Sequence, residues 1–171
     1  MLAIITTALV ETLVKHMFSN YLDEVDKIEI EGAPSWYMMP VDEQFCSFAH
    51  KTGPIDNIEI VKDKAKFKMI RKIDDTIEII IYDNMKYVKN NKEKKLIEKF
   101  KKDKDINLFV RKNLNYSRVK YEEEIKTIFV RACIQKDTII SYQKERLGII
   151  KKEILNSKVN DAFDELEAEL K

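Results

Sequence analysis

A row of apolar residues spaced three or four apart, from Ile58 to Ile80, constrains the fold more than any other feature of this chain. Its members are Ile58, Val61, Ala65, Met69, Ile73, Ile77 and Ile80. This spacing follows the period of an α-helix rather than that of a strand, so the row predicts a long amphipathic helix that continues to about Tyr82. Asp56 precedes Glu59 by the spacing of a capping box, which predicts a helix start near Asn57.

Segments with the alternation of β-strands lie before and after this helix. Residues 44–51 alternate and end at a Gly53–Pro54 turn, and residues 116–121 and 125–136 flank the sequence "EEE" as two strands of a hairpin. In the first strand, one face carries Phe45, Ser47 and Ala49, and the other carries Cys46, Phe48 and His50. In the last strand, one face carries Ile128, Val130, Ala132 and Ile134, and the other carries Thr127, Phe129, Arg131 and Cys133.

The other segments predict further helices. Residues 86–104 form a lysine-rich helix, residues 106–115 continue it after a break, and residues 137–155 form a helix that Gly148 interrupts. The expected fold class is therefore α+β, with a small antiparallel sheet of about three strands and long helices packed on one face. Residues 44–156 are the α+β domain, and the acidic residues 157–171 form a short C-terminal helix.

Residues 1–25 leave two interpretations open. Their apolar residues recur at helical spacing and form a broad stripe that includes Val10, Val14 and Phe18. The first interpretation is an amphipathic helix that packs on a partner or on the domain. The second is a degenerate export signal, because the apolar run has a suitable length but lacks preceding basic residues and a clear cleavage site. The run is too short to span a bilayer.

Residues 26–43 predict an extended arm. Residues 26–31, "DKIEIE", alternate like a short strand, and Pro34 and Pro40 then exclude a helix because each fixes φ and removes a backbone donor. Trp36 and Tyr37 are large anchors, so the arm should lie against the sheet–helix body or against a neighbouring molecule. We expect Trp36 to hold the arm in place and predict that both aromatic residues contact partners.

The charges of the chain are balanced overall but unevenly distributed. The net charge is +1, so there is no global field that would attract nucleic acid or an acidic membrane. Residues 86–104 contain nine lysines and three acidic residues, a net of +6, whereas residues 160–171 contain five acidic residues and one lysine, a net of −4. These segments are either solvated helix faces or contact points for partners. The lysines predicted to contact partners are Lys94, Lys95, Lys101 and Lys102.

No arrangement typical of an enzyme or a cofactor site is recognisable in the sequence. Its three glycines form no phosphate-binding loop, and neither His16 nor His50 has metal-ligating neighbours. Cys46 and Cys133 fit no zinc spacing; buried free thiols are the first interpretation, and a bridge between adjacent strands is the alternative. We therefore predict a non-enzymatic protein without metal, cofactor, small-molecule substrate or nucleic-acid partner.

Four short motifs occur in an order that resembles a known family. They are Pro34 with Trp36, the strand and turn Phe45–Gly53, Ala65 within its helix, and "FVRACIQKD" at residues 129–137. In this order they resemble the small lipoprotein family of polar-flagellated bacteria, which includes a twenty-kilodalton surface lipoprotein and its flagellar relative FlgP. The overlap covers about residues 30 to 155. Because neither cysteine follows a lipobox, the chain is most similar to paralysed-flagellum (Pfl-type) scaffold proteins.

The resemblance implies a structural role in the flagellar motor. It implies a lipoprotein-like scaffold component of a periplasmic disc or ring that is needed for motility. Its expected partners are other motor scaffold proteins and copies of itself, with membrane association that does not span the bilayer. The alternative is a cytoplasmic adaptor or regulatory protein-binding module that docks through its N-terminal helix.

Overall fold

The structure is a computed structural model that describes residues 30–85, 91, 94–95, 98 and 105–169. In chain order, its elements are β1 (Gln44–Thr52), the 3-10 turn η1 (Ile55–Asn57), α2 (Ile58–Met85), α4 (Ile106–Asn113), β2 (Asn115–Glu122), β3 (Thr127–Gln135) and α5 (Lys136–Glu169). The predicted α+β class is confirmed by this three-stranded antiparallel sheet with its helices. The predicted helix of residues 1–25 and most of the lysine-rich segment lie outside the described residues.

Strand β3 lies in the centre of the sheet, whose order is β1-β3-β2. The predicted hairpin is confirmed as β2 and β3, and β1 pairs with β3 from Gln44 opposite Gln135 to Thr52 opposite Thr127. The first eight of the nine β3 residues are buried. A strand can be buried at successive positions only when both of its faces are covered, because successive side chains point to opposite faces.

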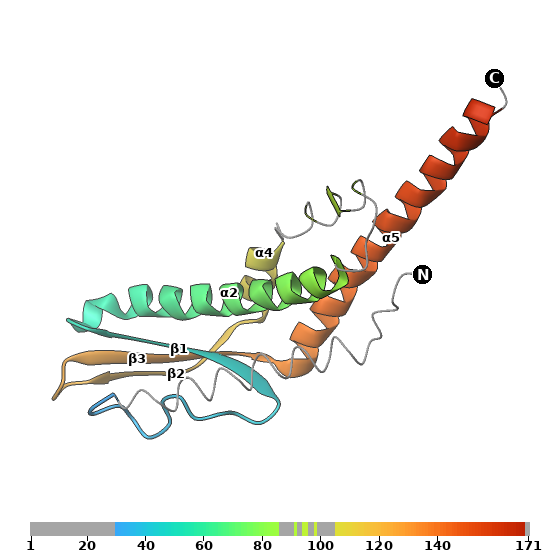
Figure 1. Cartoon of the computed structure of the whole chain (residues 1–171). Coiled ribbons are helices and arrows are strands. Elements are labelled where there is room, and N and C mark those ends of the chain that lie inside the picture. Colours follow the sequence, from blue (N-terminus) through green and yellow to red (C-terminus); the bar gives the residue numbers. More distant parts are fainter. Residues whose placement is uncertain (1–29, 86–90, 92–93, 96–97, 99–104, 170–171) are drawn as a thin grey trace.

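Helix α2 covers one of these faces (Figure 1). Val61, Ala65, Met69 and Ile73 are fully buried, which confirms the middle of the apolar row predicted for this helix. Ile58 is half-buried, and the side chains of Ile77 and Ile80 lie outside those that the structure describes. Because the Ala65 side chain is a single methyl group, β1 can approach the helix backbone closely. The Ser47 hydroxyl of β1 donates a hydrogen bond to the Ala65 carbonyl at 2.8 Å.

The start of α2 differs from the predicted capping box. Asp56 lies within η1, and the helix begins at Ile58, one residue later than predicted. The Glu59 carboxylate accepts a hydrogen bond from the Lys62 amine at 2.6 Å and so pairs forward along the helix rather than back toward Asp56. A 3-10 turn thus leads into the helix after Pro54, whose fixed φ suits a helix start.

Helix α5 follows β3 without a loop and packs with α4 against the far half of α2. The buried residues of this cluster are Phe45, Met69, Ile73, Ile106, Val110, Ile134, Ile139, Ile140, Leu147 and Ile150. Gln143, also buried, donates to the Ile73 carbonyl at 2.6 Å and joins the two long helices. Beyond this cluster, α5 extends away from the body (Figure 1).

The sequence prediction of a helix interrupted at Gly148, followed by a separate short helix, was wrong. Helix α5 is continuous from Lys136 to Glu169. A glycine in a helix interior costs only about 1 kcal/mol relative to alanine. Leu147 and Ile150, both buried on either side of Gly148, offset that cost by packing against the core.

The arm of residues 30–43 lies on the opposite face of the sheet from α2 (Figure 1). The cluster on this face contains the buried residues Tyr37, Cys46, Phe48, Phe129 and Cys133, with Ile30, Ala33, Trp36, Met38, Val41 and Ile125 packed against them. This confirms that the arm lies against the body. Of the short strand predicted for residues 26–31, only Ile30 and Glu31 are described, and neither is in a strand.

Candidate functional site: the aromatic arm

Two successive turns fold the arm over the sheet. The Ala33 amide donates to the Ile30 carbonyl at 3.0 Å, and the Tyr37 amide donates to the Pro34 carbonyl at 2.8 Å. Gly32, with φ of 75°, takes the left-handed conformation that the first turn requires. As predicted, the segment that contains Pro34 is not a helix, but it is a chain of turns rather than the extended arm that the sequence predicted. These turns direct the aromatic side chains toward the sheet.

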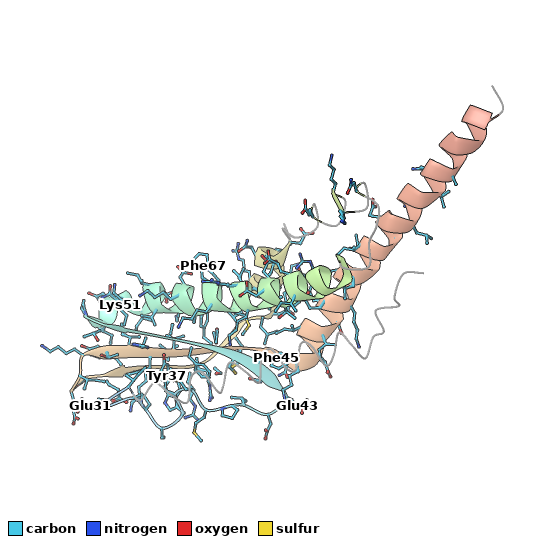
Figure 2. The ribbon with its side chains drawn as sticks, viewed as in Figure 1. Glu31, Tyr37, Glu43, Phe45, Lys51 and Phe67 are labelled. Atoms are coloured by element: carbon cyan, nitrogen blue, oxygen red, sulfur yellow. A yellow bond between two sulfur atoms is a disulfide. The ribbon has the colours of Figure 1, made fainter. Side chains whose placement is uncertain are left out.

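Tyr37 is the deepest anchor of the arm. Its side chain points from the arm toward the sheet (Figure 2) and is 7% exposed. The ring meets Phe129 edge-on at 4.8 Å and Phe48 at 5.7 Å between centroids, a favourable arrangement for aromatic pairs. Its hydroxyl lies 3.0 Å from Nδ1 of His50 and shares a hydrogen bond with it. The apolar ring is thus buried while its polar tip is satisfied.

The surroundings of His50 favour its neutral form. Burial, followed by the positive charges of Lys68 and Lys64, lowers the pKa of its imidazole below the usual value. A neutral imidazole has one donor and one acceptor nitrogen, so it can pair with the Tyr37 hydroxyl in either direction. His50 therefore contributes to holding the arm through its hydrogen bond with Tyr37.

Trp36 holds the arm as expected, but it is half-buried and therefore less deep than Tyr37. Its ring lies beneath two guanidinium groups, with Arg118 at 5.8 Å and Arg131 at 5.7 Å from the ring centroid. Arg131 also donates through Nη1 to the Trp36 carbonyl at 3.5 Å and through Nε to the Ser117 hydroxyl at 2.9 Å. Trp36 thus joins the arm to β2 and β3, whereas Tyr37 joins it to β1 and β3.

Cys46 and Cys133 form a disulfide beneath the arm. They lie directly opposite each other in the register of β1 and β3. The first interpretation of the sequence, two free thiols, was therefore wrong, and the alternative of a bridge between adjacent strands is confirmed. The bridge joins residues 87 positions apart and fastens the first strand of the body to its central strand.

None of the other described residues that were predicted to contact partners belongs to the arm. Lys94 and Lys95 lie in a helical stretch between α2 and α4, one half-buried and the other exposed. Val10, Val14, Phe18, Lys101 and Lys102 lie outside the described residues. Arg118 also belongs to the site, although it was not among the residues predicted to contact partners. Its place could have been inferred from the predicted hairpin, in which its strand pairs with the strand that carries Arg131.

Lys72 on α2 has a strongly lowered pKa. Burial first, and the charge of Lys68 second, lower the pKa of its amine to about 6. An uncharged lysine amine can act as a nucleophile when it faces a substrate cavity. Lys72 does not line the cavity between α4 and the start of α5.

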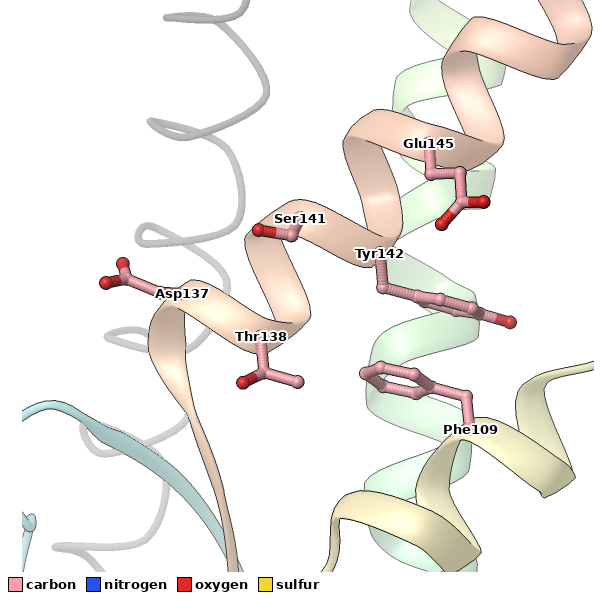
Figure 3. A pocket seen from close by; sticks show the side chains of 6 residues that line it. All are labelled: Phe109, Asp137, Thr138, Ser141, Tyr142 and Glu145. Atoms are coloured by element: carbon pink, nitrogen blue, oxygen red, sulfur yellow. The ribbon is translucent and has the colours of Figure 1, made fainter.

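A shallow cavity of about 440 Å³ lies between α4 and the start of α5 (Figure 3). Its lining residues are Phe109, Asp137, Thr138, Ser141, Tyr142 and Glu145. The rings of Phe109 and Tyr142 stack with centroids 3.8 Å apart. The lining offers the carboxylates of Asp137 and Glu145 and the hydroxyls of Thr138, Ser141 and Tyr142, but no histidine, cysteine or lysine.

The described residues contain no group of three or more potential metal ligands. None of the helices in the described part of the chain is both long and apolar enough to cross a membrane. Comparison of the chain with family models, curated proteins and solved structures found no match in any of the three. The arm, with its aromatic anchors and neighbouring arginines, is therefore defined by geometry alone.

Proposed function

We propose that this protein is a non-enzymatic scaffold component of a bacterial periplasmic flagellar motor assembly, a disc or ring accessory that is needed for motility. The observation that carries the proposal is the Cys46–Cys133 disulfide. Disulfides form and persist in oxidising compartments such as the periplasm and are rare in the cytosol. The bridge therefore favours a periplasmic scaffold over the cytoplasmic adaptor that the sequence left as the alternative.

The arrangement of the family-like motifs supports the same proposal. Trp36 contacts Arg131, which lies within the motif of residues 129–137. Ser47, in the strand motif, bonds to Ala65 in the helix motif. Cys46 is bridged to Cys133. The four motifs that resemble the lipoprotein family thus meet in one continuous unit of arm, sheet and helix.

Exposed apolar side chains provide contact points for a scaffold. Met39 on the arm is 55% exposed, and Phe67 on the outer side of α2 is 61% exposed (Figure 2). Large apolar side chains presented to solvent are enriched at protein–protein contacts. The protein would act through such surfaces together with Trp36, with no bond made or broken.

Gene deletion in the bacterium that carries this chain tests the proposal. We expect cells that retain their filaments but swim weakly or not at all, with restoration by the wild-type gene. A fusion to a fluorescent protein that matures in the periplasm should lie at the cell poles. Normal swimming of the deletion strain, or fluorescence that is diffuse in the cytoplasm, would contradict the proposal.

A C-terminal alkaline-phosphatase fusion separates the two candidate locations. The phosphatase becomes active only after export, so the periplasmic scaffold predicts high activity. An inactive fusion that is produced at a normal level would favour the cytoplasmic adaptor. A fusion to a protein with a known export signal is the positive control.

A further inference from the structure

Arg118 and Arg131 form a pair of like charges on the arm side of the sheet. They are direct cross-strand partners in the register of β2 and β3, and both guanidinium groups lie over the Trp36 ring. Among the ion pairs formed by the described residues, none joins a carboxylate to either arginine. By contrast, Lys120, two residues along β2, pairs with Glu122 at 2.5 Å.

This arrangement is unfavourable without a counter-charge. Like charges directly opposite each other on a sheet destabilise the pairing of the strands. Arg131 is only 9% exposed, and burial, followed by the charge of Arg118, lowers the pKa of its guanidinium. An anion beside the two arginines would offset the repulsion between them and would stabilise the buried charge of Arg131.

We propose that Arg118 and Arg131, with Ser117 and the Trp36 ring, form a binding site for an oxyanion. A guanidinium group presents a planar fork of N–H donors that matches carboxylate and phosphate oxygens. Arg131 uses Nε and Nη1 for the Ser117 hydroxyl and the Trp36 carbonyl, which fixes the orientation of its fork. Arg118 is exposed and contacts the Trp36 ring, so its donors remain accessible to a ligand.

Two sources could provide this oxyanion, and both have the same chemistry. One is a free inorganic anion such as phosphate. The other is a carboxylate of a protein segment, for which residues 160–171 of a second copy, with a net charge of −4, are an available example. In the second case, the inference deepens the proposed scaffold function by naming the group on the partner, and this part of it rests on that function.

The single tryptophan of the chain reports on this site directly, because Trp36 lies against both arginines. The purified full chain would be titrated separately with inorganic phosphate, with acetate and with a synthetic peptide of residues 160–171, all at constant ionic strength. We expect a saturable change in tryptophan fluorescence with phosphate or with the peptide. A response to the peptide alone would identify a protein carboxylate as the ligand. A change no larger than that produced by sodium chloride for all three probes would overturn the inference.

Variants at exposed positions separate the site from general charge effects. Arg118→Gln should weaken binding of the responding probe roughly tenfold, because one of the two charge-assisted forks is lost. Lys120→Gln removes a neighbouring positive charge that Glu122 already neutralises and should change the affinity less than twofold. Equal affinity of wild type and Arg118→Gln would overturn the inference.

Thermal stability provides a second measurement that does not depend on fluorescence. The responding anion should raise the Tm of the wild type but not that of Arg118→Gln, since ligands stabilise the folded state they bind. In the absence of anion, Arg118→Gln should melt no lower than the wild type. An anion-induced rise of equal size in both proteins would contradict the site. These measurements use purified protein, so their outcome is independent of the swimming assay.

Discussion

At the scale of single residues, the adjacent aromatics Trp36 and Tyr37 have different roles in holding the arm. Tyr37 is buried against Phe48 of β1 and Phe129 of β3, and its hydroxyl bonds to His50. Trp36 is half-buried and contacts Arg118 of the edge strand β2 and Arg131 of the central strand β3. Stability should therefore depend mainly on Tyr37, whereas contact with partners should depend mainly on Trp36.

Alanine substitutions test this division. Tyr37→Ala should lower the free energy of unfolding by about 3–4 kcal/mol, because it leaves a cavity beneath the arm and an unpaired His50. Trp36→Ala should cost roughly 1–2 kcal/mol, since part of its ring is already in water and its cation–π contacts are near the surface. Both values would come from urea unfolding, with Met39→Ala, at an exposed position of the arm, as the control. A larger cost for Trp36→Ala than for Tyr37→Ala would contradict the assignment.

At the scale of elements, the apolar row of α2 could be predicted from the sequence, whereas the burial of the Lys72 amine on the same helix could not. Its apolar spacing is local, so the sequence alone predicted a helix that the structure confirms as Ile58–Met85. The half-buried position of Lys72, whose amine nitrogen is buried, depends on how α2 packs against distant parts of the chain. Helix periodicity cannot report such a contact.

The pKa of Lys72 predicts how stability depends on pH. Its folded value of about 6 lies well below the value near 10.4 of an unfolded chain, so unfolding takes up a proton between these pH values. Stability should therefore rise as the pH increases from about 6 towards 10. Lys72→Met should remove this slope and stabilise the protein at pH 7 by on the order of 2 kcal/mol.

Urea unfolding at pH 6, 7.5 and 9 would measure this effect, because these values start at the Lys72 pKa of about 6 and extend above it. Lys66→Met is the matched control on the same helix, because Lys66 pairs with Asp63 near the surface and its pKa is raised rather than lowered. The control should retain the slope of the wild type. Parallel curves for the wild type and Lys72→Met would show that the Lys72 amine does not change its pKa on folding.

The local elements of the fold were predictable, whereas its distant pairings were not. The alternation around Phe45 and Val130 is set by each strand's own faces, so the strands and the orientation of their residues could be read from the sequence. That Cys46 faces Cys133 depends on a register between strands far apart in the chain. The same holds for the depth of Tyr37 relative to Trp36, because neighbouring aromatics in a chain of turns have no period that orders them.

At the scale of the whole molecule, the disulfide connects the N-terminal part of the body to its centre. The segment between Cys46 and Cys133 contains α2, α4 and β2, so the bridge closes a loop that holds most of the fold. In the chain-entropy account, closing so long a loop restricts the unfolded chain strongly. The bridge also fixes the strand on which the arm rests.

Removing the bridge should therefore destabilise the molecule as a whole. The double variant Cys46→Ala/Cys133→Ala should lose roughly 2–5 kcal/mol of unfolding free energy. Addition of a thiol reductant should destabilise the wild type by a similar amount. It should leave the stability of the double variant unchanged, so the double variant is the control for other effects of the reductant. Two titratable thiols in the freshly isolated, denatured protein would contradict the bridge.

The length of α5 determines how far its C-terminal end lies from the sheet. Ile150 is the last buried residue among the described side chains of α5, and the helix continues to Glu169. At about 1.5 Å per residue, residues 151–169 span roughly 28 Å, comparable to the thickness of a small domain. A molecule bound at the end of α5 would therefore lie at a fixed distance from the sheet. Lengthening or shortening the helix by one turn would change that distance by about 5 Å.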